Sequence, residues 1–339
     1  MLETGRGFAR REAWQRRLLY HDVTRRVIHV NPGIKPVRLT QEYDLFLVAC
    51  PNYWDLLYVN AIEGWKDYCR TSVCWIDEMW ASEIPLFKYW LHWLKQFDYV
   101  FVGIPGTAAS LSRVIDRECR WLPGAVDCQR FTPYPDPPPR AIDVYSIGRR
   151  WSGIHRVLVD AASRKEIFYV HDTFSAAEAM TFDHRQHRDM LGNMTKRSRF
   201  FMVAPPKMDT PDETRGQSAI GYRYYEGAAA GAVMLGQAPD CTEFREMFPW
   251  PEVVVPLQSD GSDVLPTLKR LSQEPEHIAA MGRRNAGEAL LRHDWAHRWN
   301  DMFRAVGMAP SAGMLAREAH LKEIAEPLLD SAQVQVFSR

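Results

Sequence analysis

The sequence predicts an α/β protein made of two Rossmann-like lobes, each a doubly wound parallel sheet covered by helices. Three observations lead to this prediction. A length of 339 residues suits two domains better than one. Short apolar runs rich in β-branched residues alternate with helical stretches, which is the pattern of βαβ units. A proline-rich segment at 133–140, which can continue neither a helix nor a central strand, separates two sets of five such runs.

The elements follow in a regular order within each lobe. We expect lobes at 1–135 and 141–300, and C-terminal helices at 301–339 that return to the N-terminal lobe. The expected strands are 26–30, 44–49, 72–76, 98–102 and 119–122 in the first lobe, and 143–147, 166–170, 199–203, 231–235 and 252–256 in the second. From about residue 263 the pattern is helical. Two doubly wound lobes that face one another would place a ligand cleft between the carboxyl ends of their sheets.

Charge and composition exclude several classes of protein. The 42 Lys and Arg residues balance 42 Asp and Glu residues, so the chain as a whole does not attract nucleic acid. With 46% hydrophobic residues, the chain is not intrinsically disordered. The six cysteines lack the spacing of a zinc site or a disulfide framework. No secretion signal or membrane-spanning run is visible, so we expect a cytoplasmic protein.

The N-terminal region is basic. Residues 1–40 contain nine Lys and Arg residues against three acids, and the arginines gather in the predicted first helix. Two interpretations stay open for this helix. It either touches the inner face of an anionic membrane or lies on the protein surface in contact with water.

The stretch GYRYYEGAAAGAVMLG at 221–236 is the most informative in the chain. Its small residues let a helix lie close to a sheet, and Gly231 ends that helix before an apolar strand. Glu226 lies near the start of the helix, where the positive end of the helix dipole favours an anion. The carboxylate either caps the helix or faces a ligand, and we expect it to be partly exposed.

Basic residues follow several strands of the second lobe and are candidates for binding a diphosphate. Gly148, Arg149 and Arg150 combine a glycine turn with two guanidinium groups, although a solvated arginine pair is the alternative. Arg223 either contacts phosphate or pairs with Glu226. The other candidates in this lobe are His171, Lys207 and Tyr222.

The block around Glu226 resembles the signature of GT-B glycosyltransferases of the group 1 type, in which an arginine, an aromatic residue and a glutamate precede A-x-G. Further segments similar to that family occur in the family's order: QFDYVFVG at 96–103, CRWLPGAVDCQRFTP at 119–133, DVYSIGRRWSGIHRVLVDA at 143–161 and LRHDWAHRWNDMF at 291–303. Within the family, the chain looks most similar to the spore-maturation-type branch, in which WIDEMW at 75–80 would be the counterpart of a W-x-x-D segment.

The resemblance implies a glycosyltransferase that moves a sugar from a UDP- or GDP-sugar to a hydroxyl of a glycan, glycolipid or metabolite. It implies that Glu226 accepts hydrogen bonds from the ribose of the donor. It also implies that no metal or other cofactor takes part, because arginines and helix dipoles meet the charge of the leaving diphosphate. Retention of the anomeric configuration is somewhat favoured over inversion.

The chain departs from the family pattern in two places. The position eight before Glu226 is Ser218, where retaining enzymes carry the first glutamate of a pair. The first lobe opens on a helix where the family has a strand and a glycine loop, so we expect either that the first strand is lacking or that this region is rebuilt. If the reaction inverts, Asp77 and Glu78 are the best-placed acids for a general base, unless they cap the next helix. A related protein that binds a sugar nucleotide or a protein partner without catalysis is the alternative.

Overall fold

The computed structural model describes residues 3–19, 31, 33–173 and 183–336. The chain forms two compact units, the first made of residues 1–123 and 212–217 and the second of residues 124–211 and 218–339. The division falls between Pro123 and Gly124, earlier than the predicted boundary at 135. The reason is that Val126, Cys128 and Phe131 are buried in the hydrophobic core of the second unit.

The first unit is built on a four-stranded parallel sheet in the order β2-β4-β5-β6. Its strands are β2 (Tyr43–Asn52), β4 (Cys69–Glu78), β5 (Tyr99–Val102) and β6 (Cys119–Trp121). Each coincides with a predicted strand, whereas the strand predicted at 26–30 lies outside the described residues. A separate two-stranded parallel sheet joins β1 (Val37–Arg38) to β3 (Ile62–Glu63).

Short helices and an aromatic core complete the first unit. The helices are α1 (Phe8–Leu19), α2 (Trp65–Tyr68), α3 (Ile84–Leu91) and α4 (Thr107–Ile115), with 3₁₀ helices η2 (Tyr53–Ala61), η3 (Ala81–Glu83) and η4 (His92–Gln96). The Trp65 ring stacks on Phe46 and on Phe97, with 5.0 Å between ring centroids in both pairs. Stacked rings of this kind hold α2 against the sheet.

The second unit contains a five-stranded parallel sheet in the order β11-β10-β9-β7-β8. Its strands are β7 (Ile142–Ser146), β8 (Tyr169–His171), β9 (Ser198–Val203), β10 (Val233–Gly236) and β11 (Val254–Pro256). All five overlap the predicted strands, although β8 begins later than expected. The prediction of two α/β units with parallel sheets is therefore confirmed.

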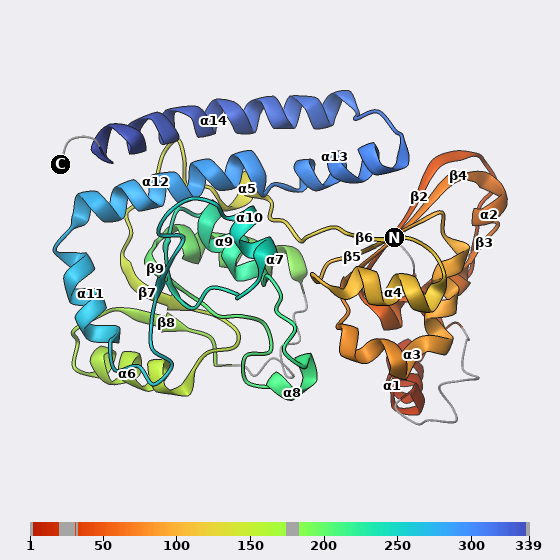
Figure 1. The fold of residues 1–339 in the computed structure, drawn as a ribbon, viewed down its shortest axis with the longest axis horizontal. Helices are drawn as coiled ribbons and strands as arrows, with labels where there is room; N and C mark the ends of the chain where they lie inside the picture. Colours follow the sequence, from red (N-terminus) through yellow and green to blue (C-terminus); the bar gives the residue numbers. More distant parts are fainter. Residues whose placement is uncertain (1–2, 20–30, 32, 174–182, 337–339) are drawn as a thin grey trace. The chain divides into compact units, whose positions relative to one another are not determined.

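The second unit also contains helices, some of which pack on this sheet while α14 packs on α12 (Figure 1). They are α5 (Cys128–Phe131), α6 (Ser152–Ser163), α7 (His184–Lys196), α9 (Tyr222–Ala229), α10 (Thr242–Met247), α11 (Val264–Ser272), α12 (Pro275–Arg292), α13 (Trp295–Val306) and α14 (Ala312–Val336). The short helix α8 (Pro211–Thr214) begins the segment 212–217, which belongs to the first unit.

The strand order of the second unit defines a topological switch point. The unit's first strand, β7, lies between β8 and β9, so the chain builds the sheet outward on one side and then on the other. At such a point the loops that follow the two central strands diverge and leave a crevice at their carboxyl ends, where α/β proteins bind ligands. In this unit the two loops follow Ser146 and Val203.

Helix α9 lies very close to the sheet at Gly227, and Ala228 and Ala229 after it are also small. A Cβ atom at Gly227 would come within 2.8 Å of the Phe201 ring and 2.9 Å of Met234. Gly231 ends the helical run with a φ of +58°, as predicted. A Cβ atom at Gly282 of α12 would come within 2.6 Å of the Gly231 carbonyl oxygen. Both α12 and the sheet therefore touch the backbone of this segment.

The last helix, α14, runs along α12 and also contacts α13 (Figure 1). The sequence predicts that residues 301–339 return to the N-terminal lobe, but their described part belongs to the second unit, where Leu321, Ala325 and Leu328 enter the core. Apolar residues on α14 find their buried face on α12, which the sequence alone does not reveal. Within the described ranges, no helix combines the length and apolar character that crossing a membrane requires.

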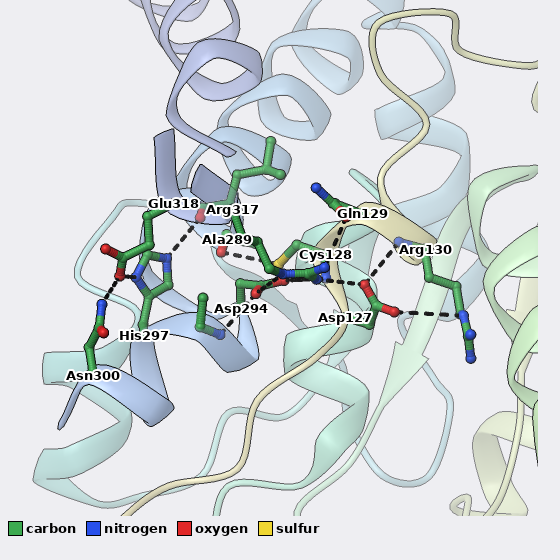
Figure 2. Close-up of polar contacts among 12 residues, drawn as sticks. Asp127, Cys128, Gln129, Arg130, Ala289, Asp294, His297, Asn300, Arg317 and Glu318 are labelled. Atoms are coloured by element: carbon green, nitrogen blue, oxygen red, sulfur yellow. Dashed lines mark hydrogen bonds and ion pairs between the residues drawn. The ribbon is translucent and has the colours of Figure 1, made fainter. Parts of the chain in front are cut away.

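Arg317 on α14 binds two aspartates that begin other helices (Figure 2). Its Nε and Nη2 atoms each lie 2.7 Å from Asp294, and Nη2 lies 2.8 Å from Asp127. Asp294 also accepts hydrogen bonds of 2.9 Å from the amides of Ala296 and Cys128. Burial raises the pKa of Asp294, but the hydrogen bonds from Arg317 and the amides outweigh burial and leave this pKa below its ordinary value.

We expect Asp294→Ala to lower the free energy of unfolding by about 3–5 kcal/mol, because removing one partner of a buried ion pair leaves uncompensated polar groups. Asp240→Ala is the matched control, since the Asp240 side chain is fully exposed and its ion pair with Arg245 is a surface contact. We expect the control to change stability by less than about 1 kcal/mol. Urea denaturation measures both variants, and equal small losses would show that the Arg317 network contributes little stability.

His293 is fully buried among aromatic rings. Its ring centroid lies 4.3 Å from that of Phe248, 5.1 Å from Tyr225 and 5.8 Å from Trp250. Neither ring nitrogen has a hydrogen-bond partner in the described part of the chain. Burial, and then the nearby arginines, lower the pKa of His293 well below its ordinary value, so the ring is neutral in the folded protein.

This burial predicts a pH dependence of stability. The unfolded chain protonates His293 at about pH 6.5, whereas the folded protein does not. The stability that the neutral ring contributes is therefore complete above about pH 6.5 and is lost below it, by up to about 1.4 kcal/mol per pH unit. We expect His293→Phe to reduce the slope of unfolding free energy against pH between about pH 5 and 6.5. An unchanged slope would assign the acid sensitivity to other groups.

Candidate functional site

The loop after β7 is a glycine turn held by an aspartate. Gly148 has a φ of +83°, in the left-handed region that glycine adopts without strain. Its amide donates a hydrogen bond of 3.0 Å to Asp172, which follows β8. Arg150 forms an ion pair with Asp172 and donates to the carbonyls of Gly148 and Asp172 at 3.2 and 2.9 Å. Arg150, a predicted diphosphate ligand, therefore joins the loop after β7 to the loop after β8.

Arg149 is the more accessible guanidinium of this turn. Its side chain is 37% exposed and pairs with Asp209, in the loop after β9, whose side chain is 54% exposed. Exposed ion pairs of this kind contribute little free energy. An anionic ligand can therefore replace the Asp209 carboxylate at Arg149 at low cost.

A small pocket lies next to this turn. Its walls include Arg149, Arg150, Trp151, His155, Tyr169 and Ala204. His155 Nδ1 lies 2.9 Å from the Tyr169 hydroxyl, and burial, followed by the charges of Arg150 and His171, lowers the pKa of His155. His171 lies edge-on to His155, with 4.8 Å between ring centroids. Sequence reasoning did not single out His155 or Tyr169, although His155 lies in the family-like segment at 143–161.

Glu226 lies at the buried side of α9 and is wholly enclosed, with no exposed side-chain surface. Our expectation of a partly exposed carboxylate was wrong, because the close approach of α9 to the sheet buries this position. The two carboxylate oxygens pair with different arginines, Oε1 with Arg188 of α7 and Oε2 with Arg223 of α9. Burial raises the pKa of Glu226, but the two guanidinium groups outweigh burial, so this pKa lies below its ordinary value.

Arg223 pairs with Glu226 in the structure, and its contact with phosphate stays a prediction. The cluster also includes Arg188, which sequence reasoning missed. Arg188 lies 38 residues before Glu226, on a helix with no recognisable motif, so only the packing of α7 beside α9 reveals the pair.

Tyr145, near the end of β7, connects the two charged clusters. The side chain is 4% exposed, and burial raises the pKa of its hydroxyl to about 12. The charges of Arg223, Asp172 and Glu226 all act on this hydroxyl. The Gly148 turn and the Glu226 cluster therefore both border the carboxyl end of β7.

Tyr222 and Lys207 occupy the remaining edges of the site. The Tyr222 ring lies against Gly124 of the PGAVD segment. A Cβ atom at Gly124 would come within 3.1 Å of the ring, so the glycine leaves room for it. Lys207 has a φ of +54° in the loop after β9. That loop touches the start of α9, because a Cβ atom at Gly221 would come within 3.2 Å of Pro206.

Asp77 and Glu78 lie at the carboxyl end of β4 in the first unit. Asp77 is half-buried and lies against Gly103. A Cβ atom at Gly103 would come within 3.0 Å of Asp77 Oδ1. Glu78 is exposed and accepts a hydrogen bond of 3.0 Å from the Trp80 indole. The two acids share one edge of one sheet, as predicted from their place after the strand.

The segment 212–217 belongs to the first unit, where Gln217 contacts Ala81 at the start of η3. Gln217 accepts a hydrogen bond of 2.8 Å from the Ala81 amide and donates to the Pro105 carbonyl at 2.6 Å and to Thr107 at 2.8 Å. The predicted domain limits place this segment in the second lobe, because no local pattern marks an excursion of six residues.

The described residues contain no group of three or more His, Cys, Asp or Glu side chains arranged to hold a metal ion. The charged groups at the switch point of the second unit are instead mainly guanidinium groups and the carboxylates that pair with them. A glycine turn, accessible arginines and a crevice at the carboxyl ends of parallel strands define an α/β unit suited to binding a phosphorylated ligand.

The family comparison agrees with this class. Residues 142–304, which include the whole sheet of the second unit, match a family model described as glycosyl transferase-like. This match confirms the predicted resemblance to group 1 glycosyltransferases, while the spore-maturation-type branch stays a prediction. A search among curated proteins gave no match.

Solved glycosyltransferase-related structures align with low sequence identity. HepE of Anabaena in complex with UDP and glucose is 11% identical over 77% of each chain, with a TM-score of 0.48. The same protein in complex with UDP aligns over 78% of this chain and 79% of its own, with a TM-score of 0.49. The pneumococcal O-GlcNAc transferase GtfA, in complex with UDP and GlcNAc, is 11% identical over 78% of this chain and 57% of its own, with a TM-score of 0.43.

Proposed function

We propose that this protein is a glycosyltransferase that moves a sugar from a nucleoside-diphosphate sugar to an acceptor hydroxyl. The observation that carries the proposal is the Gly148 turn at the switch point of a glycosyl transferase-like unit, with the accessible Arg149 beside it. UDP and GDP are the proposed nucleotides. A glycan, a glycolipid or a metabolite is the proposed class of acceptor.

In this proposal the second unit holds the donor and meets the charge that grows on the leaving diphosphate. The amides of a glycine turn and a guanidinium fork both suit a diphosphate, and fixed groups of this kind stabilise developing charge without reorganising. Arg150 and Asp172 keep the turn in its left-handed conformation. We propose that these groups act without a metal ion.

The stereochemical outcome is a separate part of the proposal. We propose retention of the anomeric configuration, on the resemblance to the group 1 family. If the product is inverted instead, Asp77 and Glu78 are the proposed sources of the general base, because they end a strand of the first unit. Analysis of the product anomer by NMR distinguishes the two outcomes.

Nucleotide release from UDP- and GDP-sugars tests the proposed activity. We expect slow hydrolysis of at least one donor in the absence of an acceptor. We expect Arg149→Ala to lower kcat/KM by roughly tenfold to 150-fold, since a charged hydrogen bond contributes about 1.5–3 kcal/mol.

Arg245→Ala is the control for Arg149→Ala, because Arg245 is also an exposed arginine paired with an exposed aspartate. Tight nucleotide binding with no turnover of any donor would favour the alternative, a binding protein without catalysis. Normal turnover by Arg149→Ala would place the diphosphate elsewhere.

A further inference from the structure

The chain enters the first unit a second time. Residues 124–211 and 218–339 belong to the second unit, but residues 212–217, which lie between them in the sequence, belong to the first. This segment ends on a tight turn, in which Arg215 and Gly216 have φ values of +50° and +80°. The Gln217 amide closes the turn by donating to the Thr214 carbonyl at 3.0 Å. Gln217 is therefore presented to the first unit at the end of a defined turn.

Three hydrogen bonds fix the side-chain amide of Gln217. Its Oε1 atom accepts from the Ala81 amide at 2.8 Å, and its Nε2 atom donates to the Pro105 carbonyl at 2.6 Å and to the Thr107 hydroxyl at 2.8 Å. A backbone amide can only donate and a carbonyl can only accept, so these partners set the orientation of the side-chain amide. Both N–H donors and one oxygen lone pair of Gln217 are in use.

A second contact attaches the segment nearer its start. The Ser82 hydroxyl donates a hydrogen bond of 2.6 Å to the Glu213 carbonyl, and the Thr214 side chain is buried. Hydrogen bonds therefore hold the segment to η3 at two points. A segment attached in this way is restrained along its length and not only at Gln217.

The partners of Gln217 follow the carboxyl ends of two neighbouring strands. Ala81 comes after β4 and opens η3, whereas Pro105 and Thr107 come after β5, near the start of α4. Ligands of α/β units bind at this edge of a parallel sheet. The contact therefore lies at the edge of the first unit where a ligand is expected, and not on its remote surface.

The same contacts reach the turn that carries Glu78. Thr107 is fully buried and donates onward to the Met79 carbonyl at 2.8 Å. Gln217 therefore holds the backbone on both sides of Trp80, once directly and once through Thr107. The Trp80 indole, which is 1% exposed, donates to Glu78 Oε1 at 3.0 Å. Because Trp80 is fixed, it orients the Glu78 carboxylate.

Groups of the proposed donor site lie on either side of the segment in the sequence. Lys207 and Asp209, which pairs with Arg149, precede it, and Tyr222 follows it at the start of α9. Asp209 is three peptide units from residue 212, and three units span at most about 11 Å. A displacement of the loop after β9 is therefore passed along the chain to residues 212–217.

We propose that residues 212–217 are a latch that ties the loop after β9 to the turn after β4, and that Gln217 is a positioning residue of glycosyl transfer. Gln217 acts by holding the backbone around Trp80, and through Trp80 it orients Glu78. The inference rests on the proposed function and deepens it, because the latch couples the donor-binding loop to the first unit. It applies to either stereochemical outcome, since this sheet edge is left for the acceptor once the second unit holds the donor.

Trypsin cleavage after Arg215 tests the latch without a measurement of activity. Arg215 is exposed, but a protease must extend the chain, and the docked left-handed turn opposes extension. We expect Gln217→Met, which keeps the side-chain size and removes its hydrogen bonds, to speed this cleavage about tenfold to 100-fold, because opening the turn no longer breaks three hydrogen bonds. Mass spectrometry of the fragment that ends at Arg215 measures the rate.

Donor turnover tests the positioning role. Water replaces the acceptor in hydrolysis of a UDP- or GDP-sugar, so hydrolysis depends on the same sheet edge. We expect Gln217→Met to lower kcat about tenfold, because misplaced groups slow the reaction, and to change the calorimetric Kd of the nucleotide less than about twofold, because the second unit holds it. A role in folding alone would lower the melting temperature and leave kcat unchanged below it.

Two further substitutions at the latch grade the effect. Gln217→Glu keeps an oxygen that accepts from the Ala81 amide but donates to neither Pro105 nor Thr107, so its kcat should lie between those of the wild type and Gln217→Met. Ser82→Ala removes only the bond to the Glu213 carbonyl and should speed trypsin cleavage about twofold to tenfold. If Gln217→Met does not fold, as judged by circular dichroism, Gln217→Glu and Ser82→Ala complete the test.

Gln273→Met is the matched control, because it makes the same substitution at an exposed glutamine of the second unit. We expect the control to match the wild type in cleavage, kcat and Kd. Wild-type cleavage rates in the folded latch variants would overturn the latch. Faster cleavage with an unchanged kcat would overturn the positioning role. A wild-type protein that turns over no donor would overturn the proposed function and the positioning role with it, while the trypsin rates would still decide whether the latch exists.

Discussion

The close approach of α9 to the sheet is the constraint on which the candidate site depends. Gly227 leaves no room for a side chain between the helix and the residues Phe201 and Met234. Helix and strand backbones can approach this far only where the facing residues are small. Because Glu226 precedes Gly227, this approach buries its carboxylate, and a buried carboxylate requires partners. Arg188 and Arg223 satisfy that requirement and thereby become fixed at the edge of the crevice.

A second set of polar contacts holds together the segments that resemble the group 1 family. The amide of Val126 donates to the carbonyl of His293, and Asp294 and Asp127 share the Arg317 side chain. The PGAVD segment at 123–127 and the HDW segment at 293–295 are far apart in sequence, yet they meet beneath α14. The occurrence of both segments in one chain therefore has a structural explanation. Each segment supplies hydrogen-bond partners for backbone or side-chain groups of the other, and neither needs to touch the donor.

The sequence predicted elements better than boundaries. Nine of the ten expected strands overlap described strands, because each apolar run is long enough to be buried in a parallel sheet. The unit boundary at Pro123 and the excursion of residues 212–217 were missed. The boundary depends on which hydrophobic core buries a side chain such as Phe131. The excursion depends on hydrogen bonds such as the one between Gln217 and the Ala81 amide. Local patterns contain no information about such choices.

Sequence by itself determined the alternation of strands and helices, the glycine at 148, and the presence of Arg149, Arg223 and Glu226 in a pattern typical of group 1 glycosyltransferases. Those features depend on local backbone preference and on the spacing of residue types. Tertiary structure alone decided that Glu226 is buried, that Arg188 joins it from another helix, and that Arg150 holds a loop. The physical reason is that burial and ion pairing depend on contacts between segments distant in the chain, and packing selects those contacts.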